Sequence, residues 1–112
     1  MLFRSKEDDI NLFFSFIEND FTLYNAVSIK ADSIHFEKKG SRELKSSDYY
    51  MDGDRIKRVA GAKSIGVTYF LSGLEDLSFA YNPEDAFVSM QIKVGGKDYK
   101  KLFSTKYLEV IE

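Results

Sequence analysis

The chain has 112 residues and a formal net charge of −2, with 44% hydrophobic and 30% charged residues. This length and balance predict a single folded domain over residues 1–112 and exclude an extensively disordered chain. The absence of cysteine excludes disulfides, thiolate metal sites and cysteine nucleophiles. The mild acidity argues against general binding to nucleic acid or anionic membranes. Because no apolar run reaches the length of a signal peptide core or a membrane span, we expect a cytoplasmic protein without membrane association.

An amphipathic helix is predicted at about residues 6–19. Ser5 is a good N-cap, and the acidic residues 7–9 suit the positive end of the helix dipole. The apolar residues Ile10, Phe13, Phe14 and Ile17 recur at helical spacing and mark one face. Residues 18–20 read as the end of this helix, and residues 21–30 read as a strand.

The middle of the chain combines one clear strand with a less readable part. Residues 33–38 alternate as a strand, whereas residues 41–44 fit either a strand or a short helix. Asp52-Gly53-Asp54 predicts a turn, because the remaining ligands of a calcium loop are missing. Residues 55–60 read as a helical turn.

The pair Gly95-Gly96 predicts a two-residue β-hairpin between alternating runs. In this register Val94 opposes Lys97, Lys93 opposes Asp98 and Gln91 opposes Lys100. The face expected to be solvated is formed by Lys93, Gln91 and Lys100, with an ion pair between Lys93 and Asp98. The face expected to be buried is formed by Val88, Ile92, Val94, Tyr99 and Phe103.

Further alternating runs complete the predicted sheet. Residues 65–71 and 77–81 read as strands, residues 82–85 as a turn, and residues 107–111 as a final edge strand or a short docking helix. The fold class is therefore α+β, with one N-terminal amphipathic helix on a five- to seven-stranded, mostly antiparallel sheet; a small closed barrel is the alternative. The helix is expected to face Ile65, Val67, Tyr69, Phe79, Val88, Met90 and Ile92.

No catalytic, metal or nucleotide motif stands out, so we expect neither an enzyme nor a bound cofactor. His35, the single histidine, lies within an alternating strand and is expected to be a polar residue facing solvent or a neighbouring strand. A scattered catalytic site is the remaining enzymatic alternative.

The leading functional hypothesis is a small non-enzymatic protein-binding module, such as an inhibitor, an immunity-type protein or a regulatory factor. Residues 64–92 contain no lysine or arginine, and their acidic side chains suit a basic surface on another protein. The cluster Tyr49-Tyr50-Met51 has polar flanks that suggest a loop, where rigid aromatic side chains make good binding anchors. The candidate protein-binding residues are Tyr49, Tyr50, Met51, Glu75, Asp76, Glu84 and Asp85.

The alternative hypothesis is a single-stranded nucleic-acid-binding protein. Basic residues alternate with aromatic ones over residues 36–63 and 97–101, a composition typical of grooves that hold single strands. Two points weigh against it. The expected Lys93–Asp98 ion pair on the solvated face makes the hairpin more like scaffold than a binding site, and the chain as a whole is acidic. The candidate residues are Arg42, Lys45, Arg55, Arg58, Lys100 and Lys101.

Overall fold

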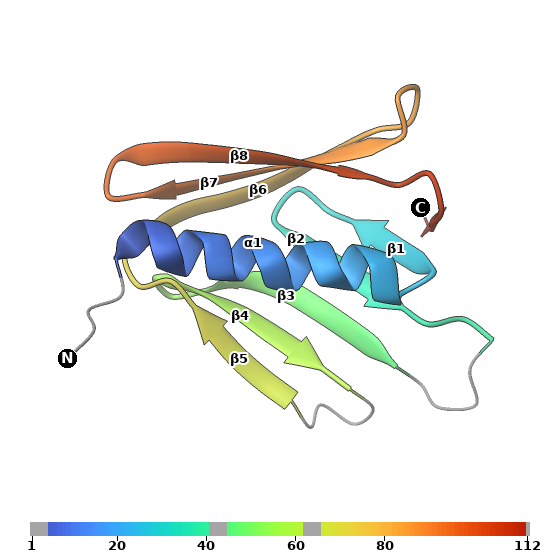
Figure 1. Ribbon diagram of the computed structural model, residues 1–112, viewed down its shortest axis with the longest axis horizontal. Coiled ribbons are helices and arrows are strands. Elements are labelled where there is room, and N and C mark those ends of the chain that lie inside the picture. Colours follow the sequence, from blue (N-terminus) through green and yellow to red (C-terminus); the bar gives the residue numbers. More distant parts are fainter. Residues whose placement is uncertain (1–4, 41–44, 62–65, 112) are drawn as a thin grey trace.

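The computed structural model describes residues 5–40, 45–61 and 66–111, which form one helix and nine strands (Figure 1). The elements are, in chain order, α1 (Lys6–Leu23), β1 (Ala26–Ile29), β2 (Ser33–Glu37), β3 (Ser46–Asp52), β4 (Arg55–Ala60), β5 (Gly66–Phe70), β6 (Leu74–Asn82), β7 (Phe87–Val94), β8 (Lys97–Ser104) and β9 (Glu109–Ile111). The fold class is α+β, as predicted.

The larger sheet has six strands, within the expected five to seven, and a second sheet of three strands accompanies it. Six strands lie in the order β5-β4-β3-β2-β1-β9, and three in the order β6-β7-β8. All pairings are antiparallel except that of β9 with β1. Strand β6 is hydrogen-bonded to the turn regions of the larger sheet, through Phe79 N to Ala31 O and Leu74 N to Asp54 O.

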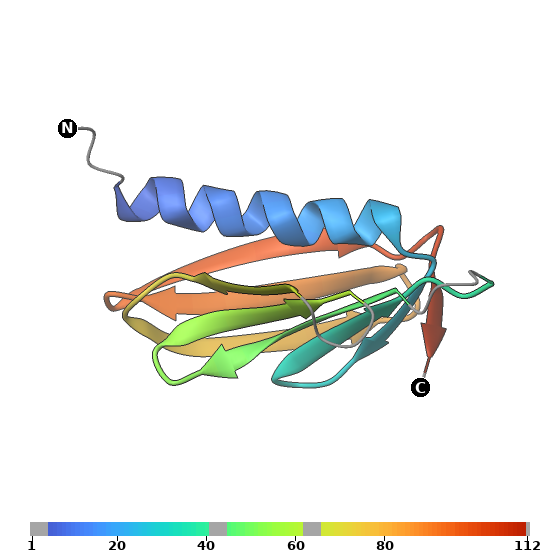
Figure 2. The same cartoon turned by 90° about the horizontal axis from the view of Figure 1, so that it is seen from below.

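The helix lies along one side of both sheets (Figure 2). The Ser5 side chain accepts a hydrogen bond from the Asp8 backbone N–H, which confirms the predicted N-cap. The predicted end at residues 18–20 is wrong, because α1 continues to Leu23. Asp20 and Phe21 prolong the buried face begun by Ile10, Phe13 and Ile17. The strand expected at residues 21–30 is therefore shortened to β1.

The core fills the space between α1 and the inner faces of both sheets. Phe13 packs against Tyr49 and Phe70, and Phe21 stacks on Phe103 with ring centroids 4.5 Å apart. Phe79, Val88, Met90 and Ile92 are buried as expected. At about 25 cal/mol per Å² of buried apolar area, these large side chains are the main source of stability.

The prediction of which β5 side chains face the helix is wrong. Val67 and Tyr69 are exposed on the side of the sheet away from the helix, whereas Phe70 is buried beneath it. Ile65, expected on the same face, lies outside the described residues. A short strand with apolar residues on both faces does not reveal which face is inward, so alternation was not enough.

The β7–β8 hairpin has the predicted register throughout. Val94 opposes Lys97, Lys93 opposes Asp98 and Gln91 opposes Lys100. Gly95 and Gly96 have φ values of 59° and 74°, the left-handed conformation for which glycine was expected. The ion pair differs from the prediction, because Lys93 Nζ lies 3.9 Å from Glu75 Oε2 of β6.

Residues 55–60 and the C-terminal tail were among the segments whose secondary structure the sequence left uncertain. Residues 55–60 form strand β4 and not a helical turn, and Asp52-Gly53-Asp54 belongs to the β3–β4 hairpin with Gly53 at φ 63°. The tail forms β9, the edge-strand alternative. The prediction for residues 41–44 falls outside the described residues. No helix within the described residues combines the length and apolarity that a bilayer crossing requires.

Candidate functional site on the outer sheet face

Tyr49, predicted to lie near a loop tip, is a core residue. It lies in the middle of β3 with its side chain fully buried against Phe13 and Phe36, so the expectation of an exposed Tyr-Tyr-Met tip is wrong. The reason is strand alternation: Ser47 and Tyr49 point inward, and Asp48 and Tyr50 point outward. Tyr50 alone of the tyrosine pair is available to a partner.

The Tyr49 hydroxyl belongs to a buried polar network centred on Asp20. Tyr49 Oη and Ser47 Oγ donate to Asp20 Oδ2 over 2.6 Å and 2.8 Å. Arg58 completes the network with Nε 3.0 Å from Oδ2 and Nη2 3.1 Å from Oδ1. Burial raises the pKa of Tyr49, and the neighbouring Asp20 carboxylate raises it further. The network therefore joins the end of α1 to β3 and β4 by charge-assisted hydrogen bonds.

Arg58 is therefore not placed to contact nucleic acid, although it was a candidate for that role. Its guanidinium faces the helix, where it pairs with a carboxylate that is 1% exposed. Burial alone would lower the pKa of Arg58, but its hydrogen bonds to Asp20 and Tyr49 outweigh that effect and raise it. Its role is to hold α1 on the sheet.

The other basic candidates do not gather on one surface. Lys100 is exposed on the outer face of β8, opposite Gln91, whereas Lys101 faces the helix and pairs with Glu18. Lys45 lines a hollow of about 300 Å³ beside Leu23. Arg42 lies outside the described residues. Of the described candidates, only Arg55 lies on the outer face of the larger sheet beside exposed aromatic rings.

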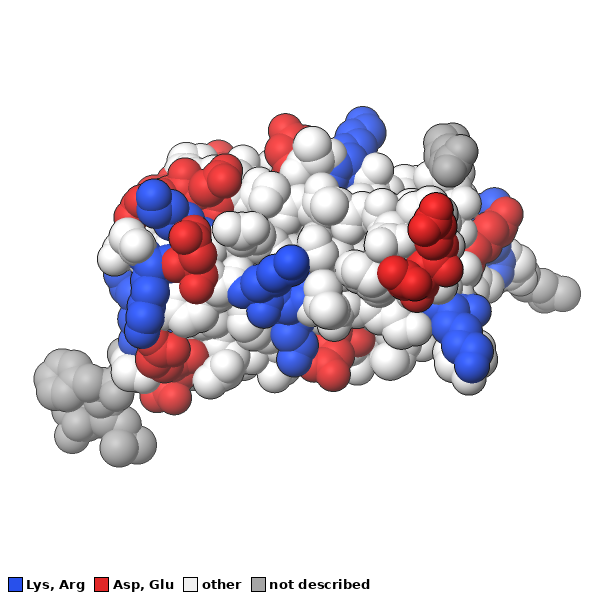
Figure 3. Space-filling view, turned by 90° about the horizontal axis from the view of Figure 1, so that it is seen from above, with Lys and Arg blue, Asp and Glu red and all other residues white. Residues whose placement is uncertain are grey.

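The acidic candidates also separate into two places. Glu75 and Asp76 lie at the start of β6, where Glu75 accepts a hydrogen bond from Gly96 N over 2.7 Å. Glu84 and Asp85 lie beyond the other end of β6, in the β6–β7 turn. Figure 3, which views the molecule of Figure 1 from above, shows acidic and basic side chains scattered over that side, without a continuous surface of either sign.

The outer face of the larger sheet, turned away from α1, carries two rows of side chains across neighbouring strands. One row is Ser33, Tyr50, Lys57 and Tyr69, and the other is His35, Asp48, Val59 and Val67. We name the residues at the β3–β5 side of this face the Tyr50 surface: Tyr50, Arg55, Lys57, Val59 and Tyr69. The sequence pattern pointed to Tyr50 and Arg55, but it did not indicate that Lys57, Val59 and Tyr69 belong to the same surface.

Cations lie over tyrosine rings on the Tyr50 surface. The Arg55 guanidinium carbon is 4.1 Å from the centroid of the Tyr69 ring. Lys57 Nζ lies between two rings, 6.0 Å from the centroid of Tyr50 and 5.8 Å from that of Tyr69. The ion pairs found among the described residues involve other cations. Arg55 and Lys57 instead lie beside aromatic rings, and the nearby carboxylate is that of Asp52, which lies opposite Arg55 and accepts a hydrogen bond from the Tyr69 hydroxyl over 3.5 Å.

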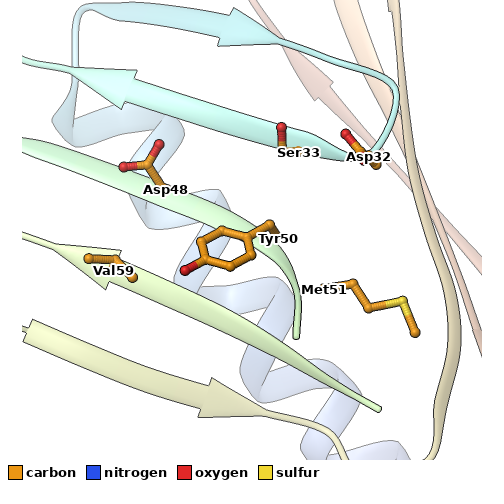
Figure 4. A pocket seen from close by; sticks show the side chains of 6 residues that line it. All are labelled: Asp32, Ser33, Asp48, Tyr50, Met51 and Val59. Carbon is orange, nitrogen blue, oxygen red and sulfur yellow. The ribbon is translucent and has the colours of Figure 1, made fainter. Parts of the chain in front are cut away.

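Two adjoining hollows indent the outer face. The larger, of about 450 Å³, has Tyr50 in the middle, with Asp48 and Val59 on one side and Asp32, Ser33 and Met51 on the other (Figure 4). Helix α1 lies behind the sheet in this view, which places the hollow on the face away from the core. The smaller hollow, of about 320 Å³, extends the same depression toward Ser28 and Lys30.

His35 lies between two carboxylates on this face, as a cross-strand polar residue of the predicted kind. Its Nδ1 is 2.6 Å from Asp48 Oδ1, and its Nε2 is 2.9 Å from Glu37 Oε1. Burial alone would lower the pKa of His35, but the hydrogen bonds and negative charges of Asp48 and Glu37 outweigh it and raise the pKa. Since both ring nitrogens are engaged, the imidazole has no free nitrogen in this arrangement for proton transfer to a substrate.

Within the described ranges 5–40, 45–61 and 66–111, no group of three metal-ligating side chains is placed to hold a metal ion. The outer face carries aromatic rings, two cations, the carboxylates of Glu37, Asp48 and Asp52, and a shallow hollow. The signal that could have located it is pairing: once β3, β4 and β5 are aligned as consecutive hairpins, Tyr50, Lys57 and Tyr69 fall in one row.

Comparison of the chain with models of known protein families, with curated proteins and with solved structures finds no match.

Proposed function

We propose that the protein is a non-enzymatic protein-binding module, of the inhibitor, immunity or regulatory kind, which binds its partner through the Tyr50 surface. The observation that carries this proposal is the placement of Arg55 and Lys57 over the rings of Tyr50 and Tyr69. Arginine and tyrosine are, with tryptophan, the side chains enriched among those that dominate binding energy in protein interfaces, because they combine large area with directional polar groups.

The partner is expected to supply carboxylates, flanked by a side chain that joins an apolar stem to a hydrogen-bond donor. The charged groups of Arg55 and Lys57 lie beside aromatic rings. A partner carboxylate can therefore approach them without displacing an existing ion pair. The hollow beside Tyr50 is lined by Met51 and Val59 together with Asp32, Ser33 and Asp48, so it suits a partner side chain that carries a hydrogen-bond donor on an apolar stem. This reverses the charge relation expected from the sequence, in which acidic residues of this chain met a basic partner.

Nucleic acid is the less favoured ligand for the same face. A strand of nucleic acid along this face would bring successive phosphates against Glu37, Asp48 and Asp52, which lie on it or at its margin, whereas a single partner carboxylate needs to reach only Arg55 and Lys57. The basic candidates outside this face, Lys100 and Lys101, lie on the other sheet and face different directions. A continuous cationic path along a strand of nucleic acid is therefore not supported by the described residues.

The test compares two doubly substituted proteins as baits in affinity capture from the native host, with quantitative mass spectrometry. The variant Arg55→Ser/Lys57→Ser removes both cations of the Tyr50 surface. The control Lys93→Ser/Lys100→Ser removes the same charge from the exposed outer face of the smaller sheet. Two central side chains, each contributing more than about 1 kcal/mol, correspond to a loss of at least about thirtyfold in affinity for the captured partner.

The proposal requires a partner that the wild type and the control bind equally and the Arg55/Lys57 variant loses. A partner retained by both variants would contradict it. Anisotropy of a labelled single-stranded oligonucleotide, measured at low and moderate salt, tests the alternative. Tight binding that weakens steeply with salt and depends on Arg55 and Lys57 would replace the protein-binding proposal with the nucleic-acid one.

A further inference from the structure

Strand β5 is an edge strand without the residues that normally protect sheet edges. Its sequence, Gly66–Phe70, contains no charged residue and no proline, and among the described residues it is paired only with β4. It forms the lower margin of the sheet in Figure 1. Natural proteins usually place lysine, proline, a bulge or a covering element at such an edge, because its unpaired backbone groups bind other strands.

The other three edges of the two sheets have such protection. Strand β8 carries Lys97, Lys100 and Lys101, and β9 is only three residues long. Strand β6 has a register irregularity between Leu74 and Asp76 and is hydrogen-bonded to the β1–β2 turn. The contrast singles out β5 as the edge suited to pairing.

Exposed apolar side chains gather beside the same edge. Val67 and Tyr69 of β5 are 49% and 41% exposed, although both are large hydrophobic residues. On the helix, Phe16 packs against Phe70 with ring centroids 5.0 Å apart, and it remains 37% exposed. Leu12 lies one turn before Phe16 and is also exposed. Of the seven exposed large hydrophobic residues in the described part of the chain, two lie on β5, a third packs against it, and Leu12 lies one helical turn from that third residue, a grouping typical of an interface.

We propose that two copies of this chain associate through antiparallel pairing of β5 with β5, about a two-fold axis at Thr68. The axis places Val67 opposite Tyr69 of the second copy, and Thr68 opposite its counterpart. An aromatic and a β-branched residue form a favourable cross-strand pair, and Gly66 lies opposite Phe70, an arrangement that compensates for the missing glycine side chain.

A second copy is the occupant because the strand is complementary to itself. No charge in Gly66–Phe70 meets a like charge across the axis, and each exposed side chain receives an apolar neighbour. The exposed flank of α1 at Leu12 and Phe16 faces its counterpart on the inner side of the extended sheet, which adds apolar area. Two-fold pairing of one surface with itself is the commonest symmetry of soluble oligomers. This association does not depend on the proposed binding function.

The first experiment measures mass in solution by size-exclusion chromatography with light scattering. The wild type is expected at twice the chain mass of 12.9 kDa. Val67→Lys places a charge on the pairing edge and is expected to halve the mass. The control Leu102→Lys changes a residue of similar exposure on β8 and leaves the dimer intact. Circular dichroism confirms that each variant is folded.

The second experiment reads the register by disulfide formation, which the cysteine-free chain makes unambiguous. Thr68→Cys is expected to cross-link to its own counterpart under mild oxidation. Val67→Cys and Tyr69→Cys are expected to cross-link to each other in a mixture and poorly with themselves. Ser89→Cys, on the outer face of β7, serves as the uncross-linked control.

Three results would overturn the proposal. One is a wild type that stays monomeric at the highest concentration reached. Another is a dimer that survives Val67→Lys and gives no cross-link at Thr68→Cys. The last is a monomer whose β5 edge pairs instead with a strand of a different protein, detected by cross-linking of Thr68→Cys to that protein.

Discussion

The Asp20 network gives a prediction whose size follows from the contacts described above. Asp20 is 1% exposed and accepts hydrogen bonds from Ser47, Tyr49 and Arg58. The substitution Asp20→Asn keeps the volume but leaves the partly buried Arg58 guanidinium without its counter-charge. Breaking a buried ion pair by removing one partner costs about 3–5 kcal/mol, and we expect a loss at the lower end because Arg58 is partly accessible.

The assay is urea unfolding followed by circular dichroism, with thermal unfolding as a second probe. A loss of about 3 kcal/mol corresponds to a decrease in Tm on the order of 10 °C or more for a domain of this size. The matched control is Asp98→Asn, which changes the same group at an exposed position and should shift stability by less than about 0.5 kcal/mol.

A double variant tests the cause of the loss. Replacing both charges, as in Asp20→Leu/Arg58→Met, removes the buried charge together with its partner, so its stability should exceed the value obtained by adding the two single losses. An Asp20→Asn variant within about 1 kcal/mol of the wild type would refute the reasoning, because the ion pair would then have little influence on stability.

Two further predictions concern the hairpin and the histidine. Gly96→Ala should lower the free energy of unfolding, measured in urea, by about 1 kcal/mol, since φ at this position is 74°. Gly95→Asn should lower it by less, because asparagine tolerates positive φ. Equal losses for the two variants would contradict this explanation. The raised pKa of His35 means that the folded state binds the imidazole proton more tightly than the unfolded state does. The wild type should therefore be more stable than His35→Gln, fully so below the ordinary pKa of 6.5. This advantage is lost as the pH rises through the folded pKa. Urea midpoints of wild type and variant across this pH range measure the difference, and a constant difference would contradict the prediction.

The sequence predicted those features that depend on local chemistry. The N-cap at Ser5 follows from hydrogen bonding within one turn, and the register at Gly95-Gly96 follows from the positive φ of a two-residue loop. Both involve residues a few positions apart, so no knowledge of the remaining chain was needed.

Features set by distant partners were missed. Asp20 reads as a helix-terminating residue until Arg58, which lies 38 positions later, is known to neutralise it. The alternation of β3 predicts that Asp48 and Tyr50 share a face, but only the partner strands decide that this face is the outer one. The Tyr50 surface was likewise invisible as a unit, because its members come from three strands whose pairing was not predicted.

The parallel pairing of β1 with β9 has a consequence for the order of folding. It joins residue 26 to residue 109, whereas the neighbouring hairpins join residues close in the chain. Closing so long a loop costs conformational entropy before any contact compensates for it, so β9 is expected to pair late, after the hairpins have formed. If β9 pairs last, β1 is an unprotected edge until then, and strand exchange between molecules can compete with completion of the native sheet.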